Sequence, residues 1–530
     1  MTAYTLLSVA LAEAQTNVGE EDVDVVSTYN PVLADAVKTN VEPQVPKNNA
    51  KPEEQTYDLP LAFYPIAYQP VLVKPIRISD EKKPDLDNVY VKVGFGTQLT
   101  PLAEAYLNSN RSEKYNYGLF GKYISSNGTL ENQNYSDLSL GGDAKFFFDD
   151  KYALPLHAYY GANTLHYYGY NNEDTTFDKK DIEQKFNKYG FDVAFHNIGD
   201  NPLDMNFGLQ AGFTGISDIN KYHENHPFLR AYAEKELQNK SIVGAAFDYD
   251  YFAYVGAGEH YNYLTGVRPY YRMTGDGWSL KAALETRVDK DNNAYILPDA
   301  TFSYNLIGYK LAFVAGLQSH LQINDFENIV DENPFVKDTL RYVNSAITET
   351  WAGFRGSTNG NFSFTIKGYR KNASDLPFYI NDSTDEKRFD IVYSDAGIWG
   401  GNIELSYFDA DRFRFTAALN AFTFSDIAKL DKAYHRPTME WTFSGMYSFN
   451  RKLSANLDVF GIGKSYALLS DGTEPEIPGT IDMNVSATYM YSKYFNIFLN
   501  CNNLAAFKYQ KYYNYPSYGL QILGGISFSF

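Results

Sequence analysis

The chain has 530 residues, a formal net charge of −18 and 16% aromatic residues, with 46 Tyr and 37 Phe. So acidic a chain is an improbable partner for nucleic acid, whose phosphates require basic surfaces. The single cysteine, Cys501, excludes a disulfide framework. From Tyr57 to the end, no stretch approaches the roughly 18 uninterrupted apolar residues of a membrane-spanning helix. The tyrosine content is typical of the aromatic girdles on membrane-spanning β-barrels.

The first residues have the pattern of an export signal. An apolar core from Leu6 to Leu11 precedes the small-x-small site Ala12-Glu13-Ala14. The basic residues that usually open such a signal are missing, so residues 1–14 are predicted to be a truncated signal peptide. Export from the cytoplasm of a Gram-negative cell, together with the strand pattern below, predicts an outer-membrane location.

Residues 15–87 are predicted to form an extended arm, periplasmic or lumenal. Prolines punctuate this segment throughout and disfavour regular structure. Apolar residues nevertheless gather between Leu59 and Val73, and a linker free in water has no need of them. We therefore expect Tyr57 to Ile78 to dock inside or beneath the barrel. A wholly disordered linker is the alternative.

Residues 88–530 have the alternation of β-strands. In the last strand, Ile526, Phe528 and Phe530 alternate with small or polar residues, which gives one apolar face. An aromatic residue at the end of such a strand is typical of outer-membrane barrels, whose last strand closes against the first, and these three residues are the predicted closing signal. The predicted strands are 88–97, 101–109, 115–126, 133–148, 152–168, 186–198, 201–215, 226–237, 240–253, 262–273, 277–287, 294–306, 308–323, 348–356, 361–371, 392–408, 412–424, 438–449, 452–464, 480–491, 495–503 and 517–530.

Connection lengths predict how these strands are arranged. Short breaks rich in Gly, Asn and Asp follow the even strands, as at Asp149-Asp150 and Gly199-Asp200, and suit tight hairpins. Long connections follow most odd strands. In outer-membrane barrels the short side is periplasmic, so an even count puts both barrel ends in the periplasm. The predicted fold is therefore all-β, a transmembrane antiparallel β-barrel of about 22 strands. The predicted long loops are 169–185, 216–225, 254–261, 324–347, 372–391, 425–437, 465–479 and 504–516.

The predicted strands also have distinct faces. Ile481, Met483 and Val485 alternate with Asp482 and Asn484. Lipid must contact the first set, because a charge at the middle of the bilayer costs roughly 2–4 kcal/mol. The second set is predicted to line a polar lumen. A soluble β-sandwich or propeller is the alternative, but its strands would average about five or six residues.

Several stretches carry a family resemblance: 402–407, 478–482, 494–500, 502–504, 512–516 and 524–530. They resemble the closing strands of TonB-dependent receptors. The resemblance covers about residues 88–530, and that family's barrel has 22 strands. It also implies a segment that binds TonB, for which Glu21, Val23, Val25 and Val26 match the acidic-then-valine pattern. The family carries an N-terminal plug of well over a hundred residues, whereas about 70 mature residues precede Asn88 here. The plug is thus predicted to be missing, which argues against TonB-driven import.

Candidate binding chemistry is sparse. His223 and His226, in the predicted loop after the seventh strand, and Glu259 and His260, after the ninth, are the best metal candidates, because imidazole and carboxylate bind Zn²⁺. Solvated loop histidines are the simpler interpretation. Tyrosine clusters at 159–160, 167–168, 249–254 and 512–515 belong to a girdle or stack a flat ligand.

Two functions fit these patterns. The first is a receptor or transport barrel of the TonB-dependent class without a full plug. The second is a barrel subunit of a multi-protein outer-membrane assembly or secretion complex. An embedded enzyme is disfavoured, because no close Ser/His/Asp set lies on the polar faces. The expected partners are outer-membrane lipid and other outer-membrane or periplasmic proteins, with TonB a further candidate, and no cofactor is expected.

Overall fold

The structure is a computed structural model that describes residues 87–170, 176–256, 258–308, 310–337, 342–358, 361–409 and 412–530. The predicted signal peptide, arm and TonB-binding segment lie outside these residues. No helix in the described part of the chain is long and apolar enough to cross a membrane.

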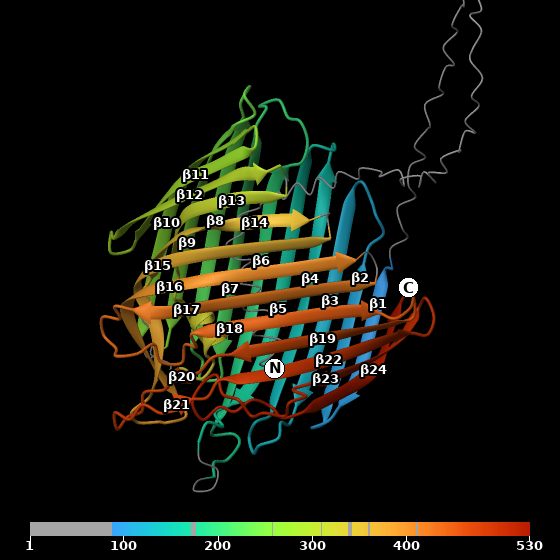
Figure 1. Ribbon diagram of the computed structural model, residues 1–530, viewed down its shortest axis with the longest axis vertical. Coiled ribbons are helices and arrows are strands. Elements are labelled where there is room, and N and C mark those ends of the chain that lie inside the picture. Colours follow the sequence, from blue (N-terminus) through green and yellow to red (C-terminus); the bar gives the residue numbers. More distant parts are fainter. Residues whose placement is uncertain are drawn as a thin grey trace, which may run out of the picture. The chain divides into compact units, whose positions relative to one another are not determined.

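Twenty-two antiparallel strands form one closed sheet, so the predicted fold and strand number are confirmed (Figure 1). The first half of the wall comprises β1 (Val89–Gly96), β2 (Thr100–Asn108), β3 (Tyr115–Ser126), β4 (Tyr135–Phe148), β5 (Tyr152–His166), β6 (Glu183–Asn197), β7 (Asn206–Asp218), β8 (His223–Glu236), β9 (Ile242–Val255), β10 (Glu259–Gly275) and β11 (Trp278–Asp289). The second half comprises β12 (Ala294–Ile307), β13 (Leu311–Gln322), β14 (Ser345–Thr358), β15 (Phe362–Asn381), β16 (Phe389–Asp409), β17 (Phe413–Ser425), β18 (Met439–Ser448), β19 (Leu453–Ile462), β22 (Thr480–Met490), β23 (Phe495–Asn502) and β24 (Gln521–Ser529). A short helix, α2 (Phe326–Glu332), and a two-stranded sheet, β20 (Ser465–Tyr466) with β21 (Glu476–Ile477), lie in the connections.

The last strand closes the barrel against the first. Ile526 pairs with Val93 and Phe528 pairs with Val91 across β24 and β1. The carbonyl of Phe530 accepts hydrogen bonds from the backbone N–H groups of Asn88 and Val89, at 2.8 and 2.9 Å. Both ends of the wall therefore lie at the same end of the barrel, the one with the short turns, and the blue β1 lies beside the dark red β24 (Figure 1).

Several predicted connections are strand instead. The predicted loop 372–391 is mostly strand, because β15 runs on to Asn381 and β16 starts at Phe389. The predicted loops 216–225 and 254–261 shrink to 219–222 and 256–258. Conversely, the turn predicted at Gly199-Asp200 spans 198–205. The asymmetry between the two ends still holds, since the connection from β13 to β14 alone spans 323–344.

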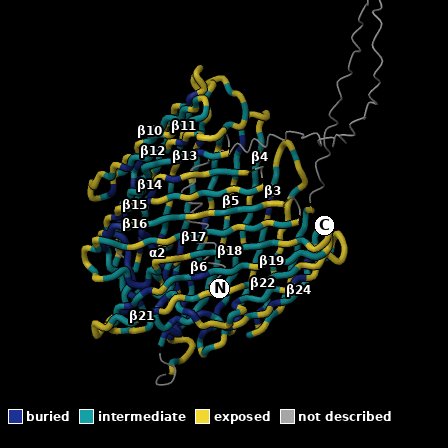
Figure 2. The backbone as a smooth tube through the Cα atoms, in the orientation of Figure 1, coloured by how far each residue is buried: buried dark blue, intermediate teal, exposed yellow. Residues whose placement is uncertain are grey.

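The two faces of the wall are as predicted. Ile481 is 53% exposed and points outward, whereas Asp482, the next residue, is 1% exposed and points inward. Burial is intermediate along most of the wall, and buried segments gather around α2 and β21 at the long-loop end (Figure 2). An apolar outer face on a closed 22-stranded barrel indicates an outer-membrane protein, as the sequence predicts.

On the inner face of the wall, glycines leave room for large aromatic side chains of neighbouring strands. A Cβ at Gly316 would lie 2.7 Å from the ring of Trp351, and one at Gly400 would lie 2.3 Å from the ring of Tyr369. Each ring therefore lies against the backbone of the neighbouring strand instead of projecting into the lumen. This arrangement keeps bulky side chains close to the wall.

Candidate functional site

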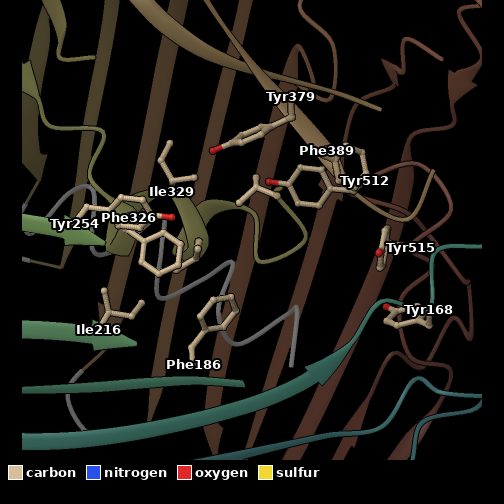
Figure 3. Packing of buried hydrophobic residues seen from close by; sticks show 12 residues of the cluster. Tyr168, Phe186, Ile216, Tyr254, Phe326, Ile329, Tyr379, Phe389, Tyr512 and Tyr515 are labelled. Atoms are coloured by element: carbon tan, nitrogen blue, oxygen red, sulfur yellow. The ribbon is translucent and has the colours of Figure 1, made fainter. Parts of the chain in front are cut away.

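Apolar side chains from distant parts of the chain meet at the long-loop end of the barrel. They point toward one another from strand ends, connections and α2 (Figure 3). We call this set the mouth cluster. It consists of Tyr168, Phe186, Ile216, Tyr254, Phe326, Ile329, Val330, Val336, Tyr379, Phe389, Tyr512 and Tyr515.

The β13–β14 connection supplies the centre of this cluster. Its described residues, 323–337 and 342–344, are called the lid here, and they include α2. The helix begins because Asp325 caps it, with the Asp325 carboxylate accepting a hydrogen bond from the N–H of Asn328 at 2.8 Å. Burial of Phe326, Ile329 and Val330 then directs one helix face into the barrel.

A carboxylate of the wall binds the start of the lid. Glu224 of β8 is 2% exposed, and its Oε2 accepts hydrogen bonds from the N–H of Phe326 at 3.0 Å and from the hydroxyl of Tyr342 at 2.6 Å. Burial and the neighbouring Glu224 raise the pKa of Asp325 well above its ordinary value. Two buried carboxylates thus lie side by side where the lid enters the barrel, a placement that favours protonation of one of them.

The end of α2 is held by several elements at once. The Glu332 carboxylate accepts a hydrogen bond from the Tyr379 hydroxyl at 3.0 Å and forms an ion pair with Arg436 at 3.1 Å. The Glu332 backbone carbonyl accepts a hydrogen bond from the Tyr512 hydroxyl at 2.7 Å. On the other side, Lys188 of β6 forms ion pairs with Asp331 and, at 3.4 Å, with Glu327.

The chain beyond α2 continues across the mouth. Phe335 stacks on Tyr515 of the β23–β24 connection, with ring centroids 3.6 Å apart. Val336 forms a parallel bridge with Phe389 of β16, and Lys337 forms an ion pair with Asp382 at 2.7 Å.

These contacts place the lid across the mouth rather than along one wall. Its partners come from β6 to β9, from β15 and β16, and from the connections after β17 and β23, so they are distributed around more than half of the circumference.

A buried histidine contacts two of the residues that bind the lid. His435 is 4% exposed, and its Nδ1 lies 2.9 Å from the carbonyl oxygen of Tyr379. Burial lowers the pKa of His435 to about 4. The imidazole is therefore neutral at physiological pH, and it lies edge-on to Phe389.

The strand geometry separates the four predicted metal candidates. His223 and His226 lie in β8, and Glu259 and His260 lie in β10, not in loops as predicted. Because neighbours on a strand face opposite sides, His223 and Glu259 share the outer face while His226 and His260 point inward. His226 is already engaged, since its Nε2 lies 3.0 Å from Asp250. Among the described residues, no group of three or more His, Cys, Asp or Glu side chains is arranged to hold a metal ion.

The tyrosine clusters divide between two roles. Tyr160 and Tyr249 are exposed on the outer face, in agreement with a girdle. Tyr168, Tyr254, Tyr512 and Tyr515 belong instead to the mouth cluster, and burial raises the pKa of Tyr515 well above its ordinary value. The long connection itself is predicted from the sequence as the loop 324–347, whereas the helix α2 within it is not. The signal for it was a capping pattern, Asp325 before a short apolar stretch, inside a long connection.

No protein-family model and no curated protein matches the sequence. Solved structures do match the barrel. The FrpB iron transporter from Neisseria meningitidis (F3-3 variant) matches with a TM-score of 0.67 and 11% identity, over 85% of this chain and 82% of that one. The siderophore receptor PirA from Acinetobacter baumannii matches with a TM-score of 0.64 and 9% identity, over 84% of this chain and 81% of that one. The pyoverdine receptor FpvA from Pseudomonas aeruginosa matches with a TM-score of 0.65 and 11% identity, over 85% of this chain and 79% of that one.

The chain shares with these three structures the fold of a large outer-membrane β-barrel. The resemblance stated from the closing strands is thus confirmed at the level of the fold. By their names, these three proteins are an iron transporter, a siderophore receptor and a pyoverdine receptor.

Proposed function

We propose that this chain is an outer-membrane receptor or transport barrel of the TonB-dependent class, closed at its extracellular mouth by the lid. The observation that carries the proposal is the set of contacts made by α2 with opposite parts of the wall, through Glu224 and Lys188 on one side and Tyr379 and Arg436 on the other. Cargo that enters from outside must displace these contacts.

The segments outside the described residues keep their predicted roles within this proposal. Residues 1–14 are a signal peptide, and residues 15–87 are an N-terminal arm. Glu21, Val23, Val25 and Val26 are the segment offered to TonB. The lid closes the barrel at the end opposite to the one where the wall begins.

Conductance of the purified full-length protein in planar bilayers tests the proposal. We expect a quiet parent barrel, because the lid closes the mouth. Replacing residues 326–336 with an equal length of Gly and Ser removes the contacts of α2 and is expected to produce large, weakly selective channels. Deleting Tyr57 to Ile78 in a second variant measures what the arm contributes, independently of the lid.

A control exchanges residues 470–473, at the tip of the β20–β21 hairpin, for Gly and Ser and is expected to conduct like the parent. All variants must migrate as heat-modifiable barrels before they are compared. If the lid variant inserts normally and conducts no more than the parent, the proposed closure of the mouth is wrong.

The second candidate function, a subunit of an outer-membrane assembly, predicts stable partner proteins. A pull-down from gently solubilised membranes separates the two. Recovery of a stoichiometric complex of several proteins supports the assembly subunit, whereas recovery of the barrel with TonB alone supports the receptor. The outer surface of the barrel does not by itself distinguish the two functions.

A further inference from the structure

A charged residue, Arg370, interrupts the apolar outer face of β14 to β16. From the level of Phe364 up to Arg370, the other outward positions below it on these three strands are apolar or glycine. Arg370 is exposed and occupies an outward position itself, because it alternates with inward-facing Lys367, Tyr369 and Lys371 and shares the row of Ile366. The outward residues beneath it are Phe354, Phe364, Ile366, Gly368, Ile403 and Leu405.

Arg370 is held by an aromatic neighbour. The register of β15 and β16 pairs it with Trp399, and its guanidinium carbon lies 4.8 Å from the centroid of that ring. Trp399 is 51% exposed, so the stacked pair forms part of the outer surface. Stacking fixes the plane of the guanidinium and leaves its N–H donors directed away from the ring.

The height of the pair places it at a membrane interface. Arg370 lies eight residues beyond Phe362, the first residue of β15. At about 3.4 Å per residue and a tilt of about 40°, this is roughly 20 Å above the short turns, close to the upper edge of an apolar band about 25 Å tall. The next outward residues, Asn372 and Thr348, are polar, as expected above that edge.

No acidic side chain in the described part of the chain pairs with Arg370. The nearest outward carboxylate on this part of the wall is Asp395, four residues beyond Trp399 along β16, and it accepts a hydrogen bond from the N–H of Asp375 at 2.9 Å. The described residues of this chain therefore supply no anion for Arg370. The only anions at this depth belong to lipid headgroups of the outer leaflet.

We propose that Arg370 and Trp399 form a binding site for the phosphate of a phosphorylated glycolipid of the outer leaflet, lipid A. The guanidinium donates two parallel hydrogen bonds to phosphate oxygens, and the indole contacts the sugar or acyl region beside them. The site lies outside the lumen and does not depend on the mouth cluster.

Lipid binding to the detergent-purified full-length barrel tests this site. Native mass spectrometry and ligand titrations measure the binding of lipid A, of its dephosphorylated form and of inorganic phosphate to the barrel. The parent is expected to retain lipid A and to bind the dephosphorylated form much more weakly. Arg370→Gln is expected to bind lipid A about tenfold more weakly, since a charge-assisted hydrogen bond is lost.

Arg414→Gln is the matched control. Arg414 also stacks on an aromatic ring, that of Phe408 at 5.3 Å, but it points into the lumen, so its variant should bind lipid A like the parent. Equal binding by the parent and Arg370→Gln would overturn the proposal, as would equal binding of the two forms of lipid A to the parent. Competition by inorganic phosphate at the same concentration would also overturn it, because the site would then recognise the free anion. The comparison of the two lipid A forms uses only the parent, so it stands even if a variant fails to fold.

Discussion

Phe335 and Tyr515 stack with their ring centroids 3.6 Å apart, which joins the connection after β13 to the connection after β23. These two connections are separated by more than a third of the barrel circumference. The Tyr515 hydroxyl also donates a hydrogen bond to the carbonyl of Lys387, between β15 and β16. The Tyr515 side chain thus links three connections at this end of the barrel.

The first prediction follows from this pair. Phe335→Ala removes a stacked aromatic contact, which contributes about 0.5–1.5 kcal/mol beyond the buried area. We expect brief openings in planar bilayers that the parent does not show, with an unchanged fold. Phe507→Ala, in the same connection as Tyr515 but 58% exposed, serves as the control and should stay quiet. Openings of equal frequency in both variants would mean that the stack does not hold the mouth.

The second prediction concerns pH. The pKa of Asp325 is raised by burial and by the nearby Glu224, so docking of the lid favours the protonated carboxyl. The docked lid binds more protons than the free lid, and its stability therefore falls as pH rises above about 4, the ordinary value of an Asp, until the raised value is passed. We expect the open probability to increase over that range.

The variant for this prediction is Asp325→Asn, which keeps the helix cap because Asn caps as well as Asp. It should be more closed than the parent at neutral pH, and its conductance should vary less over the same range. The other charged or titratable groups around the site are Glu327, Asp331, Lys188, His226 and Tyr342. A parent with no pH dependence would contradict the prediction without affecting the lid itself, since the Gly and Ser replacement tests that separately.

The third prediction concerns the far end of α2. Glu332 and Arg436 form an ion pair at 3.1 Å with both side chains largely shielded from water. A double-mutant cycle with Glu332→Gln and Arg436→Met is expected to give a coupling free energy of about 1 kcal/mol for lid closure, calculated from open probabilities. Additive effects would show that the pair is not coupled and that the Tyr379 hydrogen bond alone holds Glu332.

The wall could be predicted from the sequence because each lipid-facing strand is apolar on one face only. Where both faces are covered, the alternation disappears. Phe378 and Tyr379 of β15 are adjacent and both buried, the first against Phe424 and the second against the lid. Asp375, with a φ of 52°, also interrupts the register of β15 just before them. The sequence therefore predicts a loop over this part of β15.

The mouth cluster could not be predicted from the sequence for a related reason. Tyr512 and Tyr515 have the composition of girdle residues, and composition does not distinguish a ring that faces lipid from one buried beneath a loop. Their partners, such as Phe335 and Tyr379, are more than a hundred residues away in the chain. Only the closure of the barrel brings them together.

The fourth prediction tests the two faces at one height. Val485 points outward, between Leu457 and Cys501 of the neighbouring strands, whereas Ser486 points into the lumen. Val485→Arg should cost about 2–4 kcal/mol and reduce the amount of heat-modifiable barrel in the outer membrane. Ser486→Arg should insert normally, because the polar lumen accepts a charge. Equal loss from the two variants would contradict the assignment of the faces.

The last prediction concerns closure. Phe530 accepts two backbone hydrogen bonds from the start of the wall, and Phe528 contacts Phe495 with ring centroids 4.8 Å apart on the outer face. Deleting Phe528 to Phe530 removes both, together with the terminal aromatic of the predicted closing signal, so we expect the protein to stall in the periplasm and be degraded. Phe530→Tyr keeps an aromatic ring and every backbone hydrogen bond, and it should accumulate in the outer membrane like the parent. Pulse-chase labelling with fractionation distinguishes the two, and normal insertion of the truncated chain would show that the wall closes without its final residues.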